Sequence, residues 1–66
     1  MEQFAKNLRE MLKESELSQS DLARKIKVSS HTINKYCLGK NEPSFKTLRL
    51  LCRTLNCTYE ELIGPL

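Results

Sequence analysis

Residues 18–39, SQSDLARKIKVSSHTINKYCLG, carry the most informative pattern in this chain of 66 amino acids. The helical spacing of their apolar residues predicts two short helices, at about 18–26 and about 29–38. Only about three residues, around Lys27 and Val28, remain to connect them. A connection this short makes the second helix cross the first at a steep angle, so the sequence predicts a helix-turn-helix.

Hydroxyl side chains mark the starts of both helices. Ser18 stands three residues before Asp21, which is the spacing of a capping box, and Ser29 is placed to cap the second helix. Apolar residues then recur on one face of each helix. The predicted inner faces are Leu22, Ala23 and Ile26 in the first helix, and Ile33, Tyr36 and Cys37 in the second.

Three more helices are predicted outside this pair. An amphipathic pattern covers about residues 2–14. Ser44, directly after a proline, is placed to cap a helix at about 44–55, and Thr58 is placed to cap a last helix at about 58–63. No segment alternates with a period of two, so no strand is expected. The expected fold class is therefore all-α, with five helices.

The size of the chain limits the functions that it can have. A single domain over residues 1–66 is expected, and a fold of this size buries only about 60 % of the surface that the unfolded chain exposes. That leaves no room for a deep catalytic pocket. The sequence also lacks paired carboxylates on one face, a Ser/His/Asp or Cys/His arrangement and a glycine-rich phosphate loop. An enzyme with a small-molecule substrate is therefore the least favoured hypothesis.

Positive charge is concentrated in the middle of the sequence. Residues 24–53 contain eight lysines and arginines and one acid, which gives a net charge of +7. Residues 1–23 carry five acids and three bases, and residues 54–66 carry two acids, so each flank has a net charge of −2. A basic segment in a chain of net charge +3 is typical of a protein with a polyanionic partner. The alternative is an ordinary solvated helix face.

The outer face of the second helix carries no acid. Its residues are Ser30, His31, Asn34, Lys35 and Leu38, and four of these five side chains can form hydrogen bonds. A helix face without carboxylates can enter the phosphate-lined major groove of DNA, which is about 12 Å wide. The sequence therefore predicts double-stranded DNA as the partner.

Residues 17–63 resemble the Cro/Xre-type helix-turn-helix family of phage repressors. The matching motifs are Leu17-Ser18-Gln19, Asp21-Leu22-Ala23, Val28-Ser29, Ile33, Gly39-Lys40, Pro43-Ser44 and Glu61-Leu62-Ile63. With the first helix included, the resemblance covers nearly the whole chain. It implies a compact, lambda-repressor-like fold of five helices, in which the third helix reads bases in the major groove.

The resemblance also implies roles for individual residues. Base contacts are expected from Ser30, His31 and Lys35. Contacts with the sugar-phosphate backbone are expected from Gln19, Lys27, Ser29, Thr32, Asn34 and Lys40. Two positions depart from the family. Lys27 replaces a frequent turn glycine, which costs about 1 kcal/mol if its backbone is left-handed, and Leu38 replaces a residue that is polar in some members.

Neither a metal nor a cofactor is expected. Cys37, Cys52 and Cys57 are fifteen and five residues apart, without the closely spaced cysteine pair of structural zinc sites. They are interpreted as small core residues, with a metal site and a disulfide as alternatives. No apolar run is long enough to span a membrane. An odd number of cysteines and the lack of a signal sequence favour the cytoplasm, at the nucleoid of a prokaryote.

The last residues of the chain are unusually apolar. Tyr59, Leu62, Ile63 and Leu66 lie within eight residues, and a helix this short cannot bury all of them against one monomer. A symmetric dimer patch is expected at these residues. The alternative is that Leu66 is the frayed end of a domain from a longer protein.

Together these observations favour a sequence-specific DNA-binding transcriptional regulator, more specifically a repressor, that binds operator DNA as a homodimer. Two alternatives remain open: a protein-interaction or antitoxin-like module that reuses the fold, and the DNA-binding head of a longer regulator. The basic middle segment argues against the docking module, because a protein-docking face need not be so positive.

Overall fold

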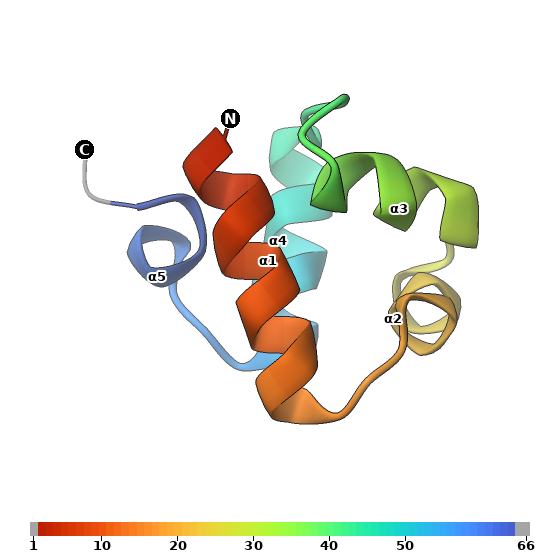
Figure 1. The fold of residues 1–66 in the computed structure, drawn as a ribbon. Helices are drawn as coiled ribbons and strands as arrows, with labels where there is room; N and C mark the ends of the chain where they lie inside the picture. The colour runs from red at the N-terminus through yellow and green to blue at the C-terminus, as the bar shows by residue number, and fades with distance from the viewer. Residues whose placement is uncertain (1, 65–66) are drawn as a thin grey trace.

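The computed structural model describes residues 2–64, and in that range it contains five α-helices and no strand. They are α1 (Glu2–Ser15), α2 (Gln19–Ile26), α3 (Ser30–Cys37), α4 (Phe45–Leu55) and α5 (Tyr59–Ile63). In Figure 1, α1 and α4 stand at the centre, with α2 and α3 on one side and α5 on the other. No helix in the described range is long and apolar enough to cross a membrane. The expected all-α fold class is confirmed.

The predicted helices agree with the observed ones to within one residue at each end. At four N-termini the difference is the cap residue itself, which has an extended backbone and accepts a hydrogen bond from a backbone N–H three residues later. These caps are Ser18, Ser29, Ser44 and Thr58. Asp21 and Glu61 complete the two capping boxes, so the helix starts are encoded locally.

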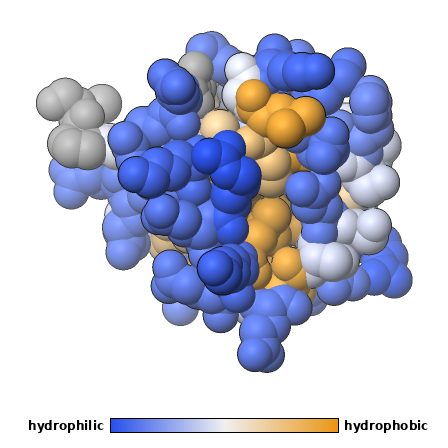
Figure 2. Space-filling model, viewed as in Figure 1, coloured by the Kyte–Doolittle hydropathy of each residue, from blue (hydrophilic) through white to orange (hydrophobic). Residues whose placement is uncertain are grey.

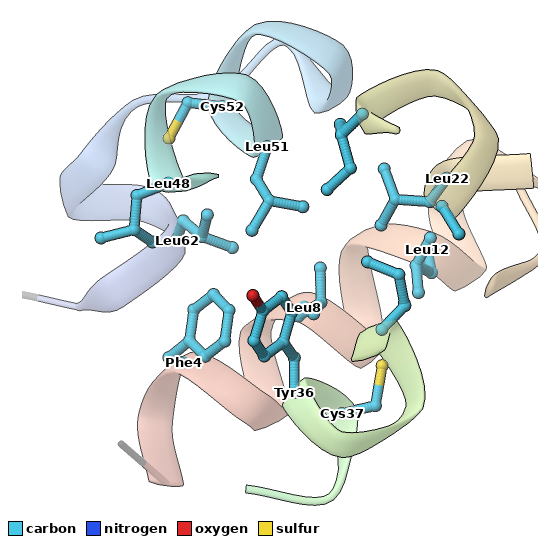
Figure 3. Close-up of a cluster of buried hydrophobic side chains, with 13 residues drawn as sticks. Phe4, Leu8, Leu12, Leu22, Tyr36, Cys37, Leu48, Leu51, Cys52 and Leu62 are labelled. Atoms are coloured by element: carbon cyan, nitrogen blue, oxygen red, sulfur yellow. The ribbon is translucent and has the colours of Figure 1, made fainter. Parts of the chain in front are cut away.

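The core draws side chains from all five helices. Its largest fully buried members are Phe4, Leu8, Leu22, Ile33, Cys37, Leu51 and Leu62. In the close-up of Figure 3, Phe4 lies beside Tyr36, and the two rings meet edge to face with centroids 6.0 Å apart. Figure 2 shows hydrophobic atoms in a seam between α1 and the α2–α3 pair, within an otherwise mostly hydrophilic face. The inner faces predicted for α2 and α3 are buried as expected.

The turn between α2 and α3 has a left-handed backbone at Lys27, with φ of 63°, so the conditional cost named for this position applies. The N–H groups of Lys27 and Val28 both donate to the carbonyl of Ala23, which closes the end of α2. Glu16 and Asn56 are also left-handed, at the ends of α1 and α4. The two hydrogen bonds to the Ala23 carbonyl offset the strain of a non-glycine residue at Lys27, which is about 1 kcal/mol.

The capping box of α2 makes the stability of the fold depend on pH in the acidic range. The Ser18 backbone N–H donates to the Asp21 carboxylate over 3.1 Å, and this bond is the main reason that the pKa of Asp21 lies below its usual 3.8. The stabilisation is present above pH 3.8 and is lost as the pH falls through the lowered pKa in the folded state. We expect Asp21→Asn to be less stable than wild type at neutral pH, with the difference shrinking below pH 3.8 in urea denaturation.

Candidate nucleic-acid interface

α2 and α3 form the predicted helix-turn-helix. α3 packs on α2 and on α1, so the helix is held from two directions. Its remaining surface lies at the edge of the molecule, away from α5 (Figure 1). This is the side of α3 that a DNA duplex can reach.

The outward side of α3 offers its polar groups at the first turn. Ser30 and His31 are exposed, whereas Lys35, one turn after His31, is half-buried. Residues four apart lie on the same helix face, so His31 and Lys35 point in a common direction.

Four of the expected backbone-contacting residues form two hydrogen-bonded pairs on α2 and α3. The Ser29 hydroxyl accepts from the Thr32 backbone N–H over 3.1 Å and lies 2.9 Å from the Thr32 hydroxyl. The Asn34 side-chain amide donates to the Gln19 side-chain oxygen over 3.3 Å. This last bond joins the start of α2 to the middle of α3. Gln19 therefore supports the half-buried Asn34 of α3.

The C-terminal end of α3 brings a second lysine close to the first. Gly39 has a left-handed backbone, with φ of 73°, and its N–H donates to the Tyr36 carbonyl. The Lys40 N–H donates to the Lys35 carbonyl over 3.0 Å, which completes a Schellman motif. Lys35 and Lys40 therefore belong to the same end of α3, while Lys27 stands exposed in the turn before its other end.

Arg9 of α1, which was not among the expected functional residues, also holds the end of α3. Its guanidinium donates to the carbonyl of Cys37, the last residue of α3. A cation at a helix C-terminus interacts favourably with the helix dipole as well as with the free carbonyl. The two residues are 28 positions apart in the chain, so no local pattern predicts the contact. Arg9 is a positioning residue for α3.

We expect Arg9→Ala to cost about 1 kcal/mol, because a charge-assisted hydrogen bond and a dipole interaction are both lost. Hydrogen exchange of the backbone amides should quicken most in the last turn of α3 and in the residues that follow it. Lys6→Ala is the matched control, since Lys6 is an exposed base of the same helix. Equal changes in the two variants would show that Arg9 has no specific role.

Comparison with known proteins shows which family the chain belongs to. Residues 7–65 match the family described as the Cro/C1-type HTH DNA-binding domain, and this range contains the whole helix-turn-helix. The chain belongs to this family. Every residue expected to touch DNA lies inside the matched range of the Cro/C1-type domain.

Relatives of this Cro/C1-type domain include regulators and an antitoxin. The solution structure of the SOS-response transcriptional repressor LexA from Eubacterium rectale matches with a TM-score of 0.87 and 31% identity, over 92% of this chain and 65% of that chain. The uncharacterized HTH-type transcriptional regulator YqaE of Bacillus subtilis (strain 168) is 30% identical, over 91% of this chain and 52% of its own. Antitoxin PezA of Streptococcus pneumoniae serotype 4 is 25% identical, over 92% of this chain and 39% of its own. The chain thus spans about half, or less, of the curated relatives.

The cysteines of this Cro/C1-type domain are packing residues. Cys37 and Cys52 are buried, and Cys57 is half-buried against the core. Burial raises the pKa of Cys57 to about 12 and also raises those of Cys37 and Cys52. The thiols are therefore protonated at neutral pH and are poor nucleophiles. Among residues 2–64 no three side chains of His, Cys, Asp or Glu gather as a metal site would require.

The apolar patch expected near the end of the chain needs a correction. Leu62 is fully buried, because α5 lies on α1 and α4 and directs this side chain into the core. Leu62 is therefore unavailable to a partner, whereas Tyr59 is 38% exposed and Ile63 is half-buried. Leu66 lies outside the described residues. Phe45 of α4, which the sequence analysis left out, is 67% exposed beside Tyr59.

Proposed function

We propose that this chain is the DNA-binding domain of a bacterial transcriptional regulator, and more specifically of a repressor. In this proposal α3 enters the major groove, with Ser30, His31 and Lys35 at base edges. Gln19, Lys27, Ser29, Thr32, Asn34 and Lys40 contact the sugar-phosphate backbone. The protein acts in the cytoplasm, at the nucleoid, and requires no cofactor or metal.

One observation carries the proposal: the solvent-facing side of α3 is polar at its first turn and contains no acid. Ser30 and His31 are exposed there, and the whole of α3 lacks aspartate and glutamate. Such a helix can approach phosphates without repulsion while its side chains offer donors and acceptors to base edges. The free N–H groups at its N-terminus add a favourable site for a phosphate.

A homodimer on a palindromic operator is part of the proposal. Two copies related by a twofold axis would place their α3 helices about 34 Å apart, which is one helical turn of DNA. The two curated relatives named above are longer than this chain.

Selection of bound sequences from a random DNA library is the test of the function. We expect an enriched palindrome with two half-sites one helical turn apart. Binding to the selected DNA should weaken steeply with salt, with a log–log slope of about −0.9 for each phosphate contacted. No enrichment, together with no salt-dependent binding to any duplex, would refute the proposal.

A protein-docking module is the second candidate, and the similarity to antitoxin PezA favours it. A docking module would hold its protein partner through a surface unrelated to α3. The double variant His31→Ala/Lys35→Ala separates the two candidates, because a docking module keeps its partner whereas a DNA reader loses its sequence preference. The +7 segment over residues 24–53 supports DNA as the partner.

A further inference from the structure

A groove lies between the C-terminal half of α1 and the turn that joins α4 to α5, and it encloses about 550 Å³. Its apolar lining consists of Met11, Leu55 and Cys57, which are half-buried and pack against the core. Apolar side chains that the fold covers only in part can bury the rest of their surface against a partner. The groove therefore offers the apolar lining that a docking site needs.

Three glutamates line the same groove. Glu10 and Glu14 are exposed and lie one helical turn apart on α1, about 6 Å from each other, and Glu61 belongs to α5. Of the described residues that line the groove, none is a lysine, an arginine or a histidine. The chain as a whole has eleven lysines and arginines and only eight acids, so this concentration of acids is local. Within residues 2–64 no salt bridge pairs any of the three glutamates with a base.

The groove lies on the side of α1 that faces away from the helix-turn-helix. Arg9 is directed toward α3, because its guanidinium donates to the Cys37 carbonyl, whereas Met11 and Glu14 line the groove. In Figure 1, α5 lies on the opposite side of α1 from α2 and α3. A duplex bound to α3 would therefore leave the groove open. The glutamates of the groove repel phosphates, so a nucleic acid is a poor occupant for it.

We propose that this groove is a docking site for a basic, amphipathic segment of a partner protein. Lysines or arginines of the segment pair with Glu10 and Glu14, while its apolar side chains contact Met11, Leu55 and Cys57. In a helical segment, bases four residues apart match the one-turn spacing of the two glutamates. Methionine suits such a surface, because its flexible thioether adapts to the shape of the partner. Docking at the groove does not require DNA binding by α3, so the two functions can be tested separately.

NMR titration of the isotope-labelled chain with a synthetic peptide tests the docking site. The probe is a short peptide of leucine and lysine in an amphipathic helical pattern, and the matched peptide has serine in place of each leucine, so that its charge is the same. We expect the leucine–lysine peptide to shift the backbone amide signals around Met11, Glu14 and Cys57. It should bind at least about tenfold more tightly than the serine–lysine peptide, because only the leucines bury apolar surface.

Three outcomes of this titration would overturn the proposal. The first is that the leucine–lysine peptide shifts no signal of the groove. The second is equal binding of the two peptides, which would show a purely electrostatic contact. The third is a shift of the groove signals with the concentration of the chain alone, which would assign the groove to a second copy.

Removal of charge from the groove tests the role of the two glutamates. The double variant Glu10→Gln/Glu14→Gln should weaken binding of the leucine–lysine peptide at least about fivefold, and the difference should shrink at high salt. Glu2→Gln/Glu60→Gln is the matched control, because it removes the same charge from exposed glutamates that do not line the groove. It should change the dissociation constant by about twofold at most. The spectra of the unbound variants verify that they are folded, and equal losses in the two double variants would overturn the proposal.

Discussion

Replacing Leu51 with alanine is expected to remove about half of the free energy of unfolding. Leu51 is fully buried, in a helix that packs on α1, α2 and α5. Truncating such a leucine leaves a cavity and costs about 2–5 kcal/mol. At roughly 0.1 kcal/mol per residue, a chain of 66 residues has on the order of 7 kcal/mol in total. The melting temperature should therefore fall by roughly 10 to 40 °C.

Leu50→Ala provides an unusually close control for this prediction. The two leucines are neighbours in α4, and alanine has the same high helix propensity at both positions. Leu50 is 36% exposed, so its truncation removes less buried surface and leaves no enclosed cavity. We expect it to cost about 1 kcal/mol or less. Urea denaturation followed by circular dichroism measures both losses, and equal losses would contradict the assignment of Leu51 to the core.

The parts of the fold that could be predicted from the sequence are those encoded within a few residues. Each capping residue acts on an N–H three positions later, so Ser18 and Ser29 mark their helices without help from the rest of the chain. Likewise, the tight turn at Lys27 needs only its neighbours, because the carbonyl of Ala23 closes it. The helix-turn-helix could be predicted for this reason.

The features that could not be predicted depend on distant parts of the chain. Leu62 was expected at the surface, but packing of α5 on α1 and α4 buries it. The bond from Arg9 to the end of α3 joins residues 28 positions apart. Phe45 begins α4 beside the leucine face, and its periodicity alone leaves it at the border between core and surface. In the structure Phe45 is 67% exposed and its ring is stacked on that of Tyr59.

The candidate site was predictable in its composition but not in its accessibility. The absence of acids from α3 follows directly from the sequence. In contrast, the exposure of the expected contact residues could not be predicted. Asn34 is hydrogen-bonded to Gln19 and half-buried, whereas His31 is exposed. This difference leads to separate expectations for residues that read bases and residues that only anchor the backbone.

Replacing Lys35 with alanine is expected to remove sequence preference more than affinity. Its position one turn after His31, on the outward side of α3, is the reason that we propose a base contact for it. A lysine that donates to a guanine contributes about 1–3 kcal/mol of discrimination, or roughly fivefold to more than a hundredfold. The affinity of the Lys35→Ala protein for the selected site should therefore fall by that factor. Its affinity for unrelated duplexes should fall little. His31→Ala should show the same pattern at a different base pair.

Lys40→Ala is the matched control, because Lys40 lies beyond the end of α3 and is bonded to the Lys35 carbonyl through its backbone N–H. Loss of a lysine that contacts only a phosphate should weaken binding to all sequences equally and lower the salt slope by about 1. Fluorescence anisotropy with the selected site, single-base variants of it and an unrelated duplex, over a series of salt concentrations, measures both quantities. If Lys35→Ala changes the affinities and the salt slope as Lys40→Ala does, Lys35 contacts a phosphate. Base recognition then depends on the exposed first turn of α3.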